Sequence, residues 1–444
     1  MFRLSSLEHN DSSIDLFPLG YPRRGFSLKP SMPSHSLRCA SSALLLAAAV
    51  FANQACAQAV GTPDGFAAGV TGGGNAPAVR PTSLLELQQA LCSSFAGNQC
   101  TDTTPRVIVL DRTFDFTGSQ ISDGSPTTTT TGCVATTCST GTSQLGLNIA
   151  NYCAGRTAAQ VSFDNAGRTP LQIGSNKTLI GLGSDGAITG RGLRVGGGNS
   201  NVIIQNITIS DINPSVVWGG DALAIDDADG VWVDHNRFAR IGRQMVVTGF
   251  GSASHVTLSN NEFDGRTSTS STCDDRHYWL WLFLGAHDTI TVARNYVHYT
   301  SGRGPHAGGL NNASVLAHMV NNYFEDLSKE GAAMPLTSTA LLLLEGNYFN
   351  KVSLPVYNYP HSPGPGYTFA PFAGMSDPRN DLCMQYLGRE CVANDQIASG
   401  SKTRPLDEQA LAGFGPVSAS LVIPASASST ATTVRANAGV GKIN

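Results

Sequence analysis

The sequence contains few charged residues and no extended run of Lys or Arg. Asp, Glu, Lys and Arg make up only 14% of its 444 residues, whereas about 25% is usual in soluble proteins. With a formal net charge of −4, the chain lacks the positive surface that a nucleic-acid-binding protein needs. Because 41% of the residues are hydrophobic, the low charge does not indicate a disordered chain either.

Long hydrophobic segments are also missing, apart from a short one near the N-terminus. Residues 41–51 form an apolar run that follows Arg38 and precedes Ala57-Gln58-Ala59, a sequence typical of signal-peptide cleavage sites. This run is too short to span a membrane. We therefore expect residues 1–59 to be an N-terminal extension and a secretory signal peptide, with Met32 as an alternative start. Residues 60–444 are expected to form a single extracellular domain without membrane attachment.

Export gives the cysteines a role. Cys39 and Cys56 would leave with the signal peptide, and an even number remains. These are Cys92, Cys100, Cys133, Cys138, Cys153, Cys273, Cys383 and Cys391. In an oxidising compartment this number predicts four disulfides, and Cys92/Cys100 and Cys383/Cys391 are close enough in sequence to form local bridges. No Cys-x-x-Cys or paired-His spacing supports a zinc site instead.

A short unit repeats along the middle of the chain: a strand with alternating apolar residues, an Asn, and a second short strand. The Asn residues are Asn206, Asn236, Asn261, Asn295, Asn322 and Asn347, at steps of 25 to 34 residues. Strands at this period, without helical periodicity, predict a parallel β-helix. Stacked coils bring like residues to about 4.8 Å. We therefore expect an asparagine ladder, in which each Asn tolerates a left-handed backbone, and we expect few charges.

The predicted coils extend from about residue 165 to about residue 350. A short amphipathic helix over Ser83–Leu91 would cover the open end of the solenoid, and residues 117–160 and 351–444 are expected to be largely loop. The longer coils carry additional loop at one turn. A solenoid collects such loops on one face, where they form the wall of a binding groove.

Neither a dinucleotide-binding motif nor a serine-hydrolase motif accounts for the function of this chain. Gly181–Gly186 matches Gly-x-Gly-x-x-Gly, but Ala187-Ile188-Thr189-Gly190 follows where a dinucleotide site needs a helix. No Gly-x-Ser-x-Gly motif is present, which argues against a serine hydrolase.

Two turns place arginine among glycines, in residues 240–244 and 301–306, and Trp218-Gly219-Gly220-Asp221 precedes a further strand. Aromatic residues gather nearby in residues 277–281, which contain two of the four tryptophans. Sugar rings stack on aromatic faces. Surface arginines alone would explain the arginine turns, but the aromatic cluster beside them favours a carbohydrate groove.

These segments carry a resemblance that covers nearly all of residues 60–444. The chain resembles the pectin lyases of polysaccharide lyase family 1, most closely those of fungal type. The matching motifs, in order, are Gly72-Gly73-Gly74, Asn176-Lys177, Asp211-Ile212-Asn213-Pro214, Gly219-Gly220-Asp221-Ala222, Asp226-Asp227, Ile241-Gly242-Arg243-Gln244, Tyr278-Trp279, Thr300-Ser301-Gly302-Arg303, Tyr386-Leu387-Gly388-Arg389 and Arg435-Ala436-Asn437-Ala438-Gly439.

The resemblance implies an all-β, right-handed, single-stranded parallel β-helix whose long loops form a substrate groove. It also implies that the protein is an enzyme, a lyase that cleaves methyl-esterified homogalacturonan (pectin) at internal bonds by β-elimination. The enzyme is expected to be a monomer and to need no cofactor. Arg303 would be the catalytic base, with Arg243 and Asp221 beside it. Arg243 would take the place of the calcium ion of related pectate lyases, so no metal is expected. The remaining substrate-binding candidates are Trp218, Tyr278, Trp279, Trp281 and His306.

The family pattern also implies that Cys133 pairs with Cys153 and Cys138 with Cys273, with Cys92–Cys100 as an additional bridge. This chain departs from the pattern at His306, where the family usually has Lys. Two alternatives remain open: a calcium-dependent pectate lyase acting on de-esterified polygalacturonate, and a non-catalytic carbohydrate-binding β-helix. A hydrolase of the polygalacturonase type would need Gly-His-Gly and Arg-x-Lys motifs, and both are missing.

Overall fold

The computed structural model describes residues 58–119, 124–310, 313–335, 337–356, 366–400 and 405–444. The predicted signal peptide lies almost wholly outside these residues. Within the described ranges, no helix has the length and apolar character needed to cross a membrane.

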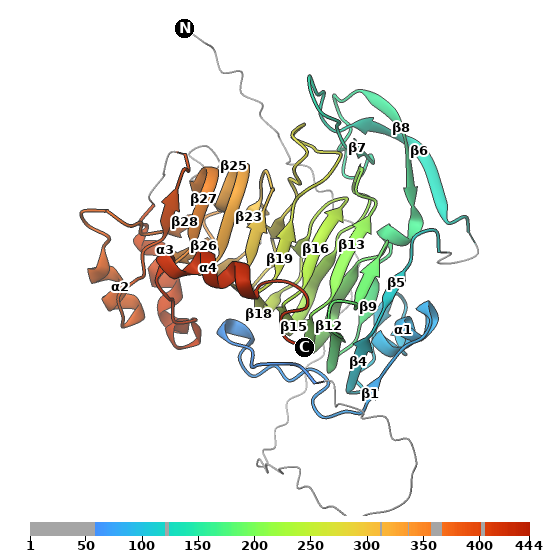
Figure 1. The fold of residues 1–444 in the computed structure, drawn as a ribbon, viewed down its shortest axis with the longest axis horizontal. Helices are drawn as coiled ribbons and strands as arrows, with labels where there is room; N and C mark the ends of the chain where they lie inside the picture. The colour runs from blue at the N-terminus through green and yellow to red at the C-terminus, as the bar shows by residue number, and fades with distance from the viewer. Residues whose placement is uncertain (1–57, 120–123, 311–312, 336, 357–365, 401–404) are drawn as a thin grey trace, which may run out of the picture. The chain divides into compact units, whose positions relative to one another are not determined.

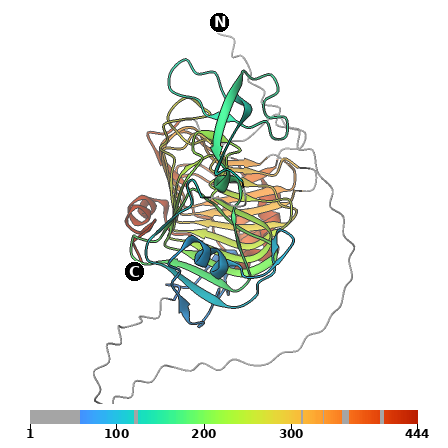
Figure 2. The ribbon, with the colours of Figure 1, turned by 90° about the vertical axis from the view of Figure 1, so that its right-hand side faces the viewer.

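A continuous sheet of 23 strands, all paired in parallel, winds through the chain and forms the predicted β-helix (Figures 1 and 2). Each coil contributes strands to three faces. The first face contains β9 (Leu171–Ile173), β17 (Val246–Thr248), β20 (Trp281–Phe283), β23 (Gly304–Ala307) and the opening segments of β12 (Leu193–Gln205) and β15 (Leu223–Asp234).

The second face continues along the closing segments of β12 and β15. Its other strands are β1 (Ala78–Val79), β4 (Arg106–Leu110), β10 (Lys177–Gly181), β18 (Ala253–Ser259), β21 (Asp288–Ala293), β24 (Val315–Val320), β26 (Ala340–Glu345) and β28 (Tyr367–Phe369).

The third face completes each coil. It contains β5 (Thr113–Asp115), β11 (Ala187–Thr189), β13 (Thr208–Ile212), β16 (Arg237–Ile241), β19 (Glu262–Asp264), β22 (Tyr296–His298), β25 (Tyr323–Pro335), β27 (Tyr348–Val356) and β29 (Asp395–Ile397). The end of β25 turns the corner and pairs with β23 on the first face.

The β-helix is longer than the sequence predicted. Its strands begin at Ala78 and end at Ile397, well outside residues 165–350. The expected loop 117–160 contains part of a four-stranded sheet of β6 (Thr127–Val134), β7 (Leu145–Gly146), β8 (Ala158–Asp164) and β14 (Val216–Val217). Residues 127–131 of β6 are all Thr, so the alternation of apolar and polar residues that predicts a strand is missing there.

Helices lie around the solenoid. The predicted N-terminal helix is confirmed as α1 (Leu84–Leu91), which begins at the N-cap Ser83 and buries Leu87 and Leu91 in the main core. Residues 351–444 are not largely loop, since they contain α2 (Asn380–Leu387), α3 (Glu408–Phe414) and α4 (Ala427–Asn437). Helix α4 lies against the third face (Figure 1), where Val434 packs with Tyr323. Short 3₁₀ helices occur at Gly65–Ala67, Asn165–Arg168 and Gly415–Ser420.

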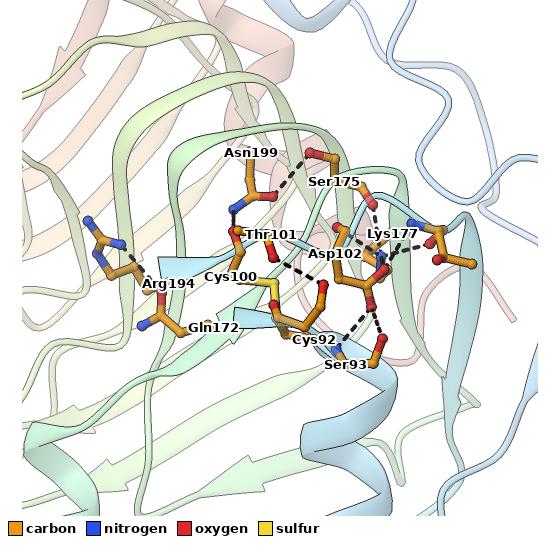
Figure 3. The surroundings of a disulfide bond; sticks show 12 residues. Cys92, Ser93, Cys100, Thr101, Asp102, Gln172, Ser175, Lys177, Arg194 and Asn199 are labelled. Carbon is orange, nitrogen blue, oxygen red and sulfur yellow. Dashed lines mark hydrogen bonds and ion pairs between the residues drawn. A yellow bond between two sulfur atoms is a disulfide. The ribbon is translucent and has the colours of Figure 1, made fainter. Parts of the chain in front are cut away.

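All four predicted disulfides are present, joining Cys92–Cys100, Cys133–Cys153, Cys138–Cys273 and Cys383–Cys391. The first closes the hairpin of β2 (Phe95–Ala96) and β3 (Gln99–Cys100). Figure 3 shows how buried polar groups tie this hairpin to the solenoid. Asn199 donates to the Cys100 carbonyl at 2.8 Å, and the fully buried Lys177 lies 3.4 Å from Asp102. Lys177 also donates to the backbone, so its buried charge is hydrogen-bonded.

Aromatic side chains stack inside the coils in the same register as the strands. Phe238 and Phe263 are stacked at 4.9 Å, and Phe324 and Phe349 at 5.0 Å. The ring of Trp281 lies edge-on between Phe263 and Phe324 and is 0% exposed. The prediction that Trp281 binds substrate is therefore wrong: its position on β20 points into the core, because strand side chains alternate between faces.

The asparagine ladder is confirmed, but its register differs from the prediction. Each amide donates to the amide oxygen on the next coil at 2.8–3.0 Å, along Asn236, Asn261, Asn295, Asn322, Asn347 and Asn394. Asn206 is not a member, because its neighbour Gln205 is in register with Asp234, so Asn206 aligns with His235. In the ladder from Asn236 to Asn347, the left-handed backbone belongs to the residue before each asparagine, such as Asn260 at φ 52°.

We predict that Asn295→Ala destabilises the fold strongly. Asn295 is 0% exposed, donates to Leu258 and Asn322, and accepts from Asn261. Its removal leaves buried partners unpaired, so the free energy of unfolding should fall by about 2–5 kcal/mol, as measured by urea denaturation. The control is Asn350→Ala, which removes a half-buried amide of the third face. Equal losses in both variants would contradict a special contribution of the ladder.

Candidate functional site

The predicted site residues lie on successive coils, in the turns that lead from the third face to the first. Leu223, Val246 and Trp281 are in register on β15, β17 and β20. Asp221, Arg243 and Trp279 precede these strands by two or three residues, and Arg303 directly precedes β23. Parallel stacking therefore brings together residues that are separated by up to about 80 positions in the sequence.

Asp221 and Arg243 form the charged centre of the site. A guanidinium nitrogen of Arg243 lies 3.7 Å from the Asp221 carboxylate, and that carboxylate also accepts from the backbone N–H of Gln244 at 2.7 Å. Burial raises the pKa of Asp221 above its ordinary value, while Arg243 and Arg303 act in the opposite direction. The carboxylate thus lies within the field of both arginines.

Each arginine lies against an aromatic ring. The Arg243 guanidinium is 3.6 Å from the centre of the Trp218 ring. The Arg303 guanidinium is 4.7 Å from the Trp279 ring and 5.7 Å from the Tyr278 ring. A cation over an aromatic face is attracted by the ring quadrupole, so the rings hold the two guanidinium groups in defined places.

The aromatic candidates therefore differ in role from the prediction of open sugar platforms. Trp279 is only 7% exposed, and the face of its ring packs against the guanidinium of Arg303. Trp218 and Tyr278 are half-buried, so part of each ring remains accessible. The structure brings Trp218, Tyr278 and Trp279 to the arginine pair, whereas Trp281 lies in the core.

The backbone of these turns is held by hydrogen bonds between coils. The Arg243 N–H donates to Gly220 at 3.0 Å, and the Trp281 N–H donates to the Arg303 carbonyl at 2.8 Å. Arg303 has a left-handed backbone, with φ 56°, which non-glycine residues rarely adopt. The coils on both sides fix this conformation.

His306 is a half-buried residue of β23, three positions after Arg303. Burial and the charges of Arg303 and Arg243 hold its pKa well below the ordinary value. At neutral pH its ring is therefore uncharged. Where the family pattern has the cation of Lys, this site has a neutral imidazole.

His277 is a residue that the sequence analysis did not assign to the site. It is buried, and its Nε2–H donates to the backbone carbonyls of Arg243 at 2.9 Å and Trp279 at 3.0 Å. Burial lowers its pKa to about 4. Its place directly before Tyr278-Trp279 was a sequence signal, but only the structure brings it to Arg243.

The donors around Asp221 do not fit a calcium ion, which prefers six to eight oxygen ligands. The charged neighbour of this carboxylate is the guanidinium of Arg243. Among the described residues, the group of acidic and His side chains close enough to share a metal is Glu262, Asp264 and His298, on the third face. Arg237 and Arg266 already form ion pairs with Asp264.

Among the described residues, a shallow, open hollow of about 830 Å³ also lies on the third face. Its arginines Arg240 and Arg266 are paired with Asp211 and Asp264. This hollow does not contain the arginine pair of the site. A substrate groove along the first face remains a prediction.

A pectate lyase family model matches residues 40–443 of this chain. A protein named as a probable pectin lyase F-1 of Aspergillus terreus is 43% identical over 389 residues, which cover 87% of this chain and 95% of that protein. A probable pectin lyase F of Neosartorya fischeri is 43% identical over 400 residues, covering 89% and 98% respectively.

A solved structure supports the fold. A pectate lyase of Bacillus sp. N165, in complex with trigalacturonate, superposes with a TM-score of 0.52 at 20% identity and covers 86% of this chain and 100% of its own. At this identity the similarity concerns the β-helix alone.

We predict that His306 is uncharged at neutral pH and does not titrate near the ordinary pKa of 6.5. Because its pKa lies well below the ordinary value of 6.5, the profile of kcat/KM against pH should have the same shape in the wild type and in His306→Gln, whatever the effect on the absolute rate. The matched control is the exposed His255, as His255→Gln. If the substitution at position 306 removed an inflection near pH 6.5, His306 would be titrating in this range and the prediction would be wrong.

Proposed function

This chain belongs to the pectate lyase family, and we propose that it is a secreted, monomeric pectin lyase that cleaves methyl-esterified galacturonan internally by β-elimination. The fungal proteins that resemble it over most of its length are named as probable pectin lyases. The single observation that carries the proposal is the guanidinium of Arg243 beside Asp221, 3.7 Å from its carboxylate.

The position of the Arg243 guanidinium beside Asp221 favours an esterified substrate. A calcium-dependent enzyme binds the carboxylate of de-esterified galacturonate through a cation held by acidic residues. Here a fixed guanidinium offers hydrogen-bond donors directly. An ester carbonyl accepts such hydrogen bonds, and because it carries no charge of its own it also acidifies the adjacent C5–H more than a carboxylate does.

In the proposed reaction, the base takes the C5 proton, and the electrons of the C5–H bond delocalise onto the ester carbonyl oxygen as an enolate. These electrons then form the C4=C5 double bond as the glycosidic C4–O4 bond breaks. The departing oxygen takes a proton from water to become the new hydroxyl, and the base returns the C5 proton to water. Negative charge develops on the ester carbonyl oxygen as the C5 proton departs. Preorganised donors that stabilise such charge contribute the largest share of many enzymatic rates, and we assign this role to Arg243.

Arg303 is assigned the removal of the C5 proton. A guanidinium is normally protonated, so Arg303 must be held where a substrate can exclude water from it. Its side chain is 5% exposed and lies over the Trp279 ring, so a bound polysaccharide would cover what remains accessible. Asp221 orients Arg243, and the neutral His306 adds no third cation next to the base.

Substrate preference tests the proposed function. We expect the unsaturated product, followed by its absorbance, to form rapidly from highly methylated pectin and slowly from polygalacturonate, with no loss on addition of EDTA. Preference for polygalacturonate and loss of activity in EDTA would identify a calcium-dependent pectate lyase instead. Binding to pectin with no unsaturated product would identify a non-catalytic β-helix.

Arg303→Lys tests the assignment of the base. Lysine keeps the positive charge but cannot reproduce the flat guanidine over Trp279, so kcat should fall at least about 100-fold, the usual contribution of general base catalysis. The control is Arg112→Lys, which changes an exposed arginine paired with Asp111. Near-full activity of the Arg303 variant would exclude Arg303 as the base.

A further inference from the structure

A buried amide connects the small four-stranded sheet to the arginine site. Gln144 directly precedes β7 and is 2% exposed. Strand β7 pairs with β14, which contains Val216 and Val217 and directly precedes Trp218. No sequence motif pointed to this residue.

The Gln144 side chain forms four hydrogen bonds, which use both of its N–H groups and two acceptor positions. Nε2 donates to the carbonyl of Pro214 at 2.8 Å and to that of Gly242 at 3.0 Å. Oε1 accepts from the Ser271 hydroxyl at 2.6 Å and from the Trp279 indole N–H at 3.1 Å.

These partners require an amide in one orientation. Backbone carbonyls only accept, so Nε2 must face Pro214 and Gly242, and an indole N–H only donates, so Oε1 must face Trp279. A carboxylate of the same shape would place an oxygen against two carbonyl oxygens. A hydrophobic side chain would leave several buried groups unpaired.

Two of these hydrogen bonds, to Gly242 and Trp279, reach the residues that flank the arginines. Gly242 is bonded covalently to Arg243, whose guanidinium lies over Trp218. The Trp279 ring supports Arg303. One side chain thus links the backbone before one arginine to the aromatic platform of the other.

The segment that carries Gln144 is itself anchored. The Cys138–Cys273 disulfide joins it to the segment 271–273, and the Thr136 hydroxyl donates to the Ser271 carbonyl at 2.8 Å. These anchors hold the segment in place, but they do not contact Gly242 or Trp279. A variant of Thr136 therefore weakens the attachment of the segment without removing the hydrogen bonds from Gln144 to Gly242 and Trp279.

We propose that Gln144 is a positioning residue that sets the distance between Arg243 and Arg303, and so between the donor for the ester oxygen and the base. The proposal rests on the lyase function proposed above. A displacement of about 1 Å between groups that act together can lower a rate about 100-fold. Loss of the Gln144 amide should therefore act on kcat rather than on substrate binding.

The experiment compares Gln144→Glu, Gln144→Met and Thr136→Val in the full-length enzyme with intact disulfides. For each variant, kcat and KM are measured on highly methylated pectin and the melting temperature is recorded. We expect both Gln144 variants to lose about 10- to 100-fold in kcat, with little change in KM. Thr136→Val should lower the melting temperature while it keeps the wild-type kcat.

A lower melting temperature of the Gln144 variants with kcat within about twofold of wild type would reduce Gln144 to a structural role and overturn the proposal. Should neither variant fold, Ser271→Ala removes the hydroxyl that donates to Oε1 and that also accepts from the Trp279 indole N–H. This variant is expected to lower kcat about two- to fivefold, the size of effect that the loss of a hydrogen bond implies, and an unchanged kcat would overturn the proposal.

The failure of the proposed function would look different. A wild-type protein that forms no unsaturated product from pectin would refute the lyase function itself. An active wild type whose Gln144 variants keep their full kcat would refute only the positioning role.

Discussion

The in-register stacking of one coil on the next determines where every functional side chain of this protein lies. Parallel hydrogen bonding between coils fixes the position of each strand relative to its neighbours. The turns that precede β15, β17, β20 and β23 therefore meet at one edge of the first face. The asparagine ladder strengthens this constraint at another turn, because each buried amide binds only if the next coil is in register. A slip of one residue would turn the site residues towards the core.

The site brings two arginines together with one half-buried carboxylate, Asp221. Arginines in such proximity repel each other, and the structure offsets this repulsion in two ways. Aromatic rings lie beneath both guanidinium groups, and Asp221 lies near them. The two histidines nearby have lowered pKa values and contribute no further positive charge at neutral pH. The charged groups of the site are therefore Arg243, Arg303 and Asp221, and burial raises the pKa of Asp221 above its ordinary value.

The support of the site comes from parts of the chain that are distant in sequence. The disulfide-bonded segment before β7 reaches the arginine turns through Gln144, and His277 donates to the carbonyl of Arg243 on the neighbouring coil and to that of Trp279 on its own coil. Gln144 belongs to no recognisable motif, and His277 is marked only by its place before Tyr278-Trp279. Positioning groups of this kind act through hydrogen-bond geometry, and a sequence pattern does not record geometry.

The repeat of strand, asparagine and strand was sufficient to predict the parallel β-helix, because its period reflects a stacked coil. The short spacing of Cys92/Cys100 and Cys383/Cys391 indicated two of the disulfides. The pairings Cys133–Cys153 and Cys138–Cys273 and the roles of Asp221, Arg243 and Arg303 follow from the resemblance of the ordered motifs to a known family. The errors have local causes. Asn206 was placed in the ladder because a one-residue shift in a turn leaves the sequence spacing almost unchanged. Trp281 was assigned to the substrate because composition near a site does not reveal which face of a strand a residue occupies.

The sequence by itself determined the repeat, the class of fold and the residue types of the site, since these follow from periodicity and motif. Only the tertiary structure decided which side of β20 Trp281 occupies, which ring supports which arginine, and that Gln144 reaches Gly242 and Trp279. The physical reason is that strand side chains alternate between core and surface. The contacts between coils join residues whose separation along the chain varies with every loop.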